Sequence, residues 1–259
     1  MTISHKIVGN AMQMIVCQLG EGQTVYAEAG KFLWKTTNVG IETKLSGGSQ
    51  SQGGGLVGAA LGIGKRMLAG ESFAFQHFTA HGGSGLVSLA GTLPGEVRAL
   101  ELDGTHGWFA EKDAFVAAET SANMDIAFSG FRQGMRGGEG FILERFTGYG
   151  TVFVAGAGNF IEVNPAKYGG KIQVHTGCIV AFQDSVTYGV ERIGGLNTQT
   201  IMSGLFGGNG FSMATLEGDG TVILQSMTIE SLAYALRKNS HSGGDKGSGP
   251  LGSLFGGND

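Results

Sequence analysis

A stretch that combines glycines with aromatic residues recurs three times along this chain. The copies read GESFAFQHFTAHGGSGLVSLA from Gly70, GEGFILERFTGYGTVFVA from Gly138 and GNGFSMATLEGDGTVILQ from Gly208. Each has an early phenylalanine, a second large apolar residue five positions later, a glycine-bearing turn and an alternating apolar run. Because the copies are about 70 residues apart, the chain is expected to fold as three similar units in succession.

Six positions serve as the predicted structural anchors of this repeat. The glycines are expected where the chain turns sharply, since glycine adopts backbone conformations that other residues avoid. The predicted anchors are Phe73, Phe141 and Phe211 at the start of the copies, and Gly85, Gly150 and Gly220 in the turns that follow.

Two further sets of short segments keep the same order in each unit. One set is EAGKFLWKTTNVGI, EKDAFVAAETSANMDI and HTGCIVAFQDSVTY; the other is GNAMQMIV, GEVRALEL and GNFIEV, which alternate with period two. Short alternating runs between turns indicate β-strands. The sequence therefore predicts an all-β fold with pseudo-threefold symmetry, in which residues 1–238 form one domain of three internal repeats, at about 1–92, 93–157 and 158–238.

Two segments depart from the strand pattern near the end of the chain. IESLAYALRK, residues 229–238, has basic residues in its last turn and predicts a short C-terminal helix. Residues 239–259 are rich in glycine and serine, which is typical of a flexible tail.

An apolar segment before the first copy is a candidate contact surface. GLVGAALGIGKRMLA, residues 55–69, carries a Lys-Arg pair at one end. It could cover a barrel mouth, lie between subunits or rest on a membrane surface. The predicted interface or membrane contacts are Leu56, Leu61, Ile63 and Met67.

Charge and cysteine content narrow the choice of partners. The formal net charge is −4 and the 17 Lys and Arg residues are scattered, which disfavours nucleic acid as a partner. Cys17 and Cys178 belong to no metal-binding pattern, so we expect reduced thiols and a cytoplasmic setting, with the inner membrane surface as an alternative. The opening MTISHKIVGN lacks a basic region followed by an apolar core, so no secretory signal is expected.

Motifs that could carry chemistry are incomplete. GGGLVG at Gly53 follows a Ser/Gln/Gly run instead of a strand, so it does not predict a dinucleotide site. His77 and His81 could share a strand face and hold a metal, but a third ligand is required. We therefore predict no catalytic, cofactor or metal residue, and keep a metal site at His77 and His81 as an alternative hypothesis.

The ordered glycines and aromatics of GESFAFQHFTAHGGSGLVSLA, together with the strand GCIVAF, resemble bacterial relatives of the altered-inheritance-of-mitochondria family. That family's fold is similar to the tryptophan RNA-binding attenuation protein. The resemblance implies a double-stranded β-helix or β-sandwich module present three times, and chains that assemble into a ring-like oligomer, expected to be a trimer. It brings no catalytic residue.

These observations give two functional hypotheses. The leading one is a non-enzymatic homo-oligomer that scaffolds or organises other components, at a membrane surface or away from one. The alternative is a binding module that holds a small ligand or single-stranded nucleic acid at the repeat junctions.

Overall fold

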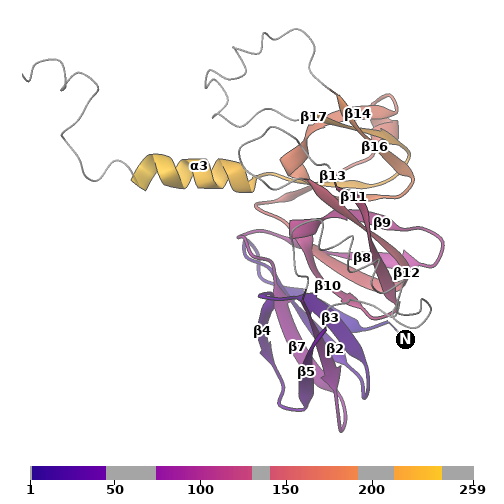
Figure 1. Cartoon of the computed structure of the whole chain (residues 1–259), viewed down its shortest axis with the longest axis vertical. Helices are drawn as coiled ribbons and strands as arrows, with labels where there is room; N and C mark the ends of the chain where they lie inside the picture. The colour runs from indigo at the N-terminus through magenta and orange to yellow at the C-terminus, as the bar shows by residue number, and fades with distance from the viewer. Residues whose placement is uncertain (1, 45–73, 130–140, 192–212, 241–259) are drawn as a thin grey trace, which may run out of the picture.

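The computed structural model describes residues 2–44, 74–129, 141–191 and 213–240. In these ranges the chain is almost entirely β-strand, with short 3₁₀ turns and one C-terminal helix (Figure 1). The predicted all-β class and the C-terminal helix are therefore confirmed. The predicted contacts Leu56, Leu61, Ile63 and Met67 and the anchors Phe73 and Phe211 lie outside the described residues.

Seven strands form the N-terminal part of the molecule. Strand β7 pairs with β2 and β4, while β6 pairs with β3 and β5, all antiparallel. Strand β1 pairs along the other side of β2. Their bounds are β1 Ser4–Val8, β2 Met14–Leu19, β3 Thr24–Glu28, β4 Phe32–Lys35, β5 Val39–Lys44, β6 Phe75–Ala80 and β7 Gly85–Ala90.

The middle part is organised around one long strand. The first half of β12 pairs with β9 and β11, and its second half pairs with β8 and β10. The bounds are β8 Val97–Asp103, β9 Trp108–Glu111, β10 Phe115–Glu119, β11 Ala122–Ser129 and β12 Ile142–Ala155.

The predicted turn at Gly150 is wrong, because β12 runs through it without interruption. Gly148 and Gly150 have φ of 98° and 100°. Two left-handed glycines change the direction of an extended chain, and residues with a Cβ avoid that conformation. The bend therefore passes β12 from one set of partners to the other while the chain stays hydrogen-bonded.

Six strands form the C-terminal part. Strand β18 pairs with β13 and β15, and β17 pairs with β14 and β16. The bounds are β13 Phe160–Val163, β14 Lys171–His175, β15 Ile179–Gln183, β16 Val186–Glu191, β17 Met213–Gly218 and β18 Val222–Gln225.

Two strand pairings connect the three parts. Strand β10 pairs with β3, and β15 pairs with β9. The strands consequently form sheets of four, eleven and three strands among the described residues. Figure 1 shows the three parts following one another along the long axis of the molecule.

The hydrophobic core crosses both connections. One cluster joins Phe78 and Leu89 of the N-terminal part to Phe153 of β12. A second joins Tyr26 to Phe146 and to Ile223 of β18, and a third lies within and beside the C-terminal part. Because buried apolar area is the main stabilising term, the adjoining parts stabilise one another.

The remaining predicted anchors occupy close-packed positions. The ring of Phe141 stacks on Tyr188 with centroids 5.4 Å apart. A Cβ added at Gly85 would overlap Val39, and one at Gly220 would overlap Ser185. Gly220 lies in the bend between β17 and β18, as predicted, and Gly85 begins β7. Neither has a left-handed backbone, so packing against a neighbouring side chain requires glycine there.

Helix α3, Ile229–Ser240, follows β18 and extends away from the sheets (Figure 1). The Thr228 hydroxyl accepts a hydrogen bond from the Ser231 N–H at 3.1 Å, which is an N-cap interaction. Glu230 lies in the first turn, where a negative charge favours the helix dipole. The helix therefore reaches two residues into the segment predicted as tail.

Candidate functional site

The outer edge of β4 is apolar, and no described strand pairs with it. Its only strand partner among the described residues is β7. Leu33 is 49% exposed and Trp34 is 43% exposed, which is unusual for adjacent large apolar residues on one short strand. An unpaired edge with exposed apolar side chains is a ready template for pairing with another strand.

The backbone N–H and carbonyl groups of β4 point alternately toward β7 and toward the outer edge. The Thr36 N–H donates to the Leu86 carbonyl of β7 at 2.9 Å. Because neighbouring residues of a strand point their backbone groups to opposite sides, the N–H and carbonyl of Lys35 face away from β7. The edge thus presents this donor and acceptor, beside Trp34, on the side where no described strand pairs with β4.

Strand β14, in the C-terminal part, is an end strand of the three-stranded sheet. Within the described ranges β14 pairs only with β17. Ile172 and Val174 are half-buried against the C-terminal core cluster, whereas Gln173 is exposed. A strand added at this edge could therefore cover the half-buried side chains of Ile172 and Val174.

Polar side chains cap the turns that follow β9 and β14. The Glu111 carboxylate accepts the Asp113 N–H at 2.8 Å, and the His175 Nδ1 accepts the Gly177 N–H at 3.2 Å. Burial, with the nearby Asp113 charge, raises the pKa of Glu111 to about 8. The pKa of Glu28 is also raised by burial, against the opposing effect of Lys31, whose ammonium lies 3.2 Å from it.

Replacement of Glu111 by Gln should flatten the pH dependence of stability. A raised pKa in the folded state means that the folded protein favours the neutral acid, so the contribution of Glu111 to stability is full near pH 4 and is lost as the pH rises to about 8. Glutamine stays neutral and keeps an oxygen acceptor for Asp113. We expect the melting temperature of Glu111→Gln to exceed that of the wild type at pH 9 and to match it near pH 4, as measured by thermal unfolding. A parallel decline of both proteins with pH would contradict this assignment.

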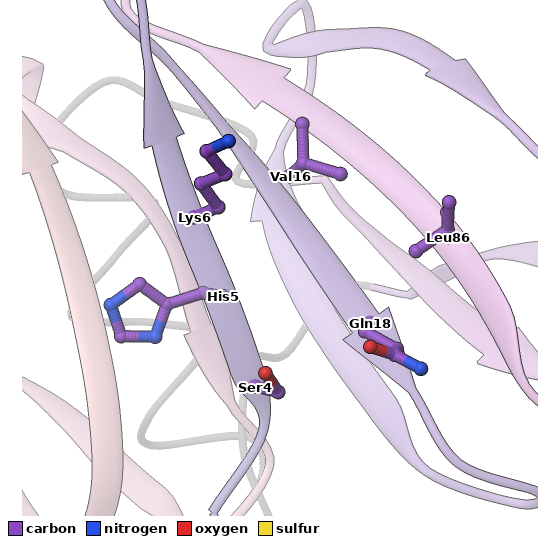
Figure 2. Close-up of a pocket in the computed structure, with 6 residues that line it drawn as sticks. All are labelled: Ser4, His5, Lys6, Val16, Gln18 and Leu86. Atoms are coloured by element: carbon purple, nitrogen blue, oxygen red, sulfur yellow. The ribbon is translucent and has the colours of Figure 1, made fainter.

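A shallow hollow lies on the sheet formed by β1, β2 and β7. It measures about 250 Å³ and is lined by Ser4, His5, Lys6, Val16, Gln18 and Leu86. Figure 2 shows His5 projecting to the other side of β1, where its ring meets Phe153 edge-on at 4.9 Å. Ligand pockets in proteins are commonly 300–1,000 Å³ and enclosed, so this hollow gives little support to the ligand-binding alternative.

The two histidines of the metal hypothesis differ in environment. His77 is buried in β6 with its ring stacked on Tyr26, with centroids 5.7 Å apart, whereas His81 is exposed beyond the end of the strand. Among the residues that the structure describes, no three His, Cys, Asp or Glu side chains gather at metal-binding distance.

The two cysteines differ in burial. Cys17 is fully buried, and burial raises the pKa of its thiol to about 12. Cys178 is partly exposed and has a raised pKa. No helix in the described part of the chain has the length and apolar character needed to cross a bilayer.

Sequence reasoning did not single out the outer edges of β4 and β14. The segment KFLWK was recognised as a strand, but nothing in its alternation distinguishes a paired edge from an open one. The usable signal is side-chain size: Leu33 and Trp34 stand where the corresponding segments AFVAA and CIVAF carry valine and alanine.

Three comparisons place the chain among known proteins. It matches the Mitochondrial biogenesis AIM24 family over residues 5–227. An uncharacterized protein of Streptococcus pyogenes serotype M6 is 29% identical over 226 residues, which cover 87% of this chain and 86% of that protein. The crystal structure of a Streptococcus pyogenes protein is similar with a TM-score of 0.68 and 26% identity, over 92% of this chain and 99% of that one.

Proposed function

Since the chain belongs to the Mitochondrial biogenesis AIM24 family, we propose that it is a non-enzymatic assembly protein whose copies join head to tail through β14 and β4 into a ring-like trimer. The oligomer acts as a scaffold that organises other components. The observation that carries this proposal is that β4 and β14 each have a described strand on one side, whereas the equivalent strands β10, β15, β3 and β9 are paired on both sides.

The proposal treats the chain as three modules, and the ladder registers support that treatment. In the pairing of β4 with β7, Phe32 lies opposite Leu89 and Trp34 lies opposite Ser88, so the extra residue is on β4, between Phe32 and Trp34. Strands β12 and β10 have the same skip between Phe115 and Ala117, and strands β18 and β15 have it between Ile179 and Ala181. Matching bulges at matching positions are expected of repeated modules.

Inside the chain each module joins the next by the same pair of strands. Ala117 lies opposite Ala27, and Ala181 lies opposite Ala110. All four of these alanines are fully buried. The strand that carries the bulge in one module, β10 or β15, thus pairs with the second strand of the module before it, β3 or β9.

The same rule applied once more brings together β4 and β14, two of the strands that end the sheets of the described residues. Strand β4 is the bulged strand of the first module, and β14 is the second strand of the third module. The registers place Trp34 of one copy opposite Val174 of the next, and Lys35 opposite Gln173. Both partners are larger than the alanines of the internal junctions, so this junction buries more apolar area, which offsets the entropy lost when separate chains associate.

A head-to-tail junction also determines the kind of assembly. It joins two different surfaces of the same chain, so repeated copies form a ring when the rotation closes. Closure with three copies gives nine modules in one ring, in keeping with the trimer expected from the family resemblance.

Cysteine pairing across the junction tests the proposal. Trp34→Cys in a tagged chain and Val174→Cys in an untagged chain, both in a Cys178→Ser background, are co-expressed and mildly oxidised. The two positions form a non-hydrogen-bonded pair with Cα atoms about 4.5 Å apart, which suits a disulfide. We expect a mixed disulfide dimer of tagged and untagged chains on non-reducing gels.

Gln173→Cys provides the matched control. It is one residue from Val174 and faces the opposite side of the sheet, so its yield with Trp34→Cys should be at most a tenth of that from the Val174 pair. Equal yields from both pairs, or no mixed dimer from either, would rule out the proposed register.

A further inference from the structure

One position on the first strand of each module is equivalent in all three modules. It is read from the strand that pairs with both the first and the bulged strand, which is β7, the second half of β12 or β18. On that strand the residue opposite the start of the bulge is Leu89, Val154 or Leu224. On its other side lies a residue of the first strand, which we call the forward residue: Ile15 in β2, Arg98 in β8 and Ile161 in β13.

At both junctions inside the chain, the forward side chain reaches the next module. Ile15 is fully buried in the core cluster that also contains Phe153 of β12, and Ala99 of β8 packs against that cluster. The Arg98 Nη2 lies 3.1 Å from the Glu162 Oε1 of β13. The forward side chain of one module thus lies against the first strand of the module that follows.

The residue that receives the forward side chain is also equivalent in these two junctions. Ala99 directly follows Arg98 in β8, and Glu162 directly follows Ile161 in β13. Neighbouring residues on a strand point to opposite faces, so the forward residue faces the next module and the receiving residue faces the preceding one. In the first module the receiving residue is Val16 of β2.

Within the described residues, the last module has a forward residue and the first module has a receiving residue with no module to meet them. Ile161 is 54% exposed, whereas Ile15, its equivalent in β2, is fully buried. Val16 lines the hollow of about 250 Å³ on β1, β2 and β7, together with Leu86 (Figure 2). An exposed isoleucine at one end of the chain therefore matches a partly apolar hollow at the other.

We propose that this hollow is a docking site for a second copy of this chain, in which Ile161 of that copy packs on Val16 and Leu86. The docking site rests on the head-to-tail assembly proposed above, but it follows from the faces of β2, β8 and β13 and uses no edge of β14. Packing of the isoleucine removes apolar area from water on both copies. Lys6 and Gln18 also line the hollow and supply the polar rim that protein interfaces have around an apolar centre.

Ile161→Arg tests the docking site in the full-length chain. Ile161 is exposed, so the chain should fold with the new side chain, as circular dichroism would check. At the junction the guanidinium would lie against Val16 and beside Lys6, which is paired with Val16 across the β1 and β2 ladder. A charge without a partner is costly at an interface, so we expect the dissociation constant of the oligomer, measured by sedimentation, to rise at least about tenfold.

Val190→Arg is the matched control. Val190 is also β-branched, lies on a strand and is 56% exposed, but it faces Ala214 of its own module. A substitution on the surface away from a contact has little effect, so the dissociation constant should stay within about twofold of the wild-type value. Equal dissociation constants for Ile161→Arg and Val190→Arg would overturn the docking site.

Val16→Glu in the same chain as Ile161→Arg should restore the assembly. The double variant copies the Arg98 and Glu162 pair of the second internal junction into the junction between copies. We expect its dissociation constant to return to within about threefold of the wild-type value, because residues in contact have coupled effects. A double variant that dissociates as readily as Ile161→Arg would show that Ile161 does not pack on Val16.

The Trp34→Cys and Val174→Cys cross-link separates the docking site from the assembly. If that pair cross-links while Ile161→Arg and Val190→Arg dissociate alike, the docking site is wrong and the assembly stands. If that pair does not cross-link and the wild-type chain is a monomer at every concentration, the assembly is wrong and the docking site fails with it. Weakening by Ile161→Arg and recovery with Val16→Glu support the docking site.

Discussion

Lys35→Pro is expected to convert the oligomer into monomers while leaving each chain folded. The Lys35 N–H faces the open side of β4, so its loss removes no hydrogen bond of the β4 and β7 ladder. At the proposed junction the same N–H pairs with β14 of the next copy, and proline removes it and places a ring in the path of the partner strand. Proline is tolerated on edge strands where the N–H faces solvent, and for this reason the monomer should survive.

Sedimentation measures the mass of the variant, and circular dichroism checks that the chain is still folded. The mass should fall to that of one chain of 26.7 kDa, with circular dichroism unchanged. Lys35→Thr removes the same charge but keeps the N–H and favours a strand, so it should remain oligomeric. A Lys35→Pro protein that keeps the wild-type oligomer mass would show that β4 is not the contact edge.

Gly95→Ala should lower the stability of the folded chain strongly. A Cβ at this position would overlap the carbonyl oxygen of Gly156 and lie 2.8 Å from the Gly158 nitrogen. Both atoms belong to the backbone that connects β12 to β13, which is held by its own hydrogen bonds and cannot move like a side chain. Overpacking generally costs 1–3 kcal/mol, and we expect about 3 kcal/mol here.

Urea unfolding of Gly95→Ala beside Gly20→Ala measures that loss. Gly20 has only the side chain of Gln23 near its missing Cβ, at 3.1 Å from the amide oxygen. That flexible side chain can move, so the control should lose less than about 1 kcal/mol. Similar midpoints for the two variants would indicate that the segments before β8 and β13 are not packed as tightly as the contact at Gly156 implies.

Local patterns were sufficient to predict the strands and the closing helix. The segments GNAMQMIV, GEVRALEL and GNFIEV contain or begin the strands β2, β8 and β13. Alternation and turn residues act over a few positions, so they can be read from the chain directly. The turn predicted at Gly150 failed because a glycine at positive φ can bend a strand as well as end it.

The candidate edges could not be predicted from local sequence. The pairing of β3 with β10 joins residues about 90 positions apart, as Ala27 and Ala117 show, and no short-range pattern encodes such a contact. Which strands end a sheet is known only from the strand order, here that of the described residues. Trp34 carried the one usable hint, because a large exposed side chain stands where the matching strands have alanine.

The solution mass of the wild-type chain is the most direct test of the central claim. Light scattering coupled to size-exclusion chromatography, at protein concentrations from about micromolar upward, should give a single species of three times 26.7 kDa. A species of 26.7 kDa at every concentration would contradict head-to-tail assembly through β4 and β14.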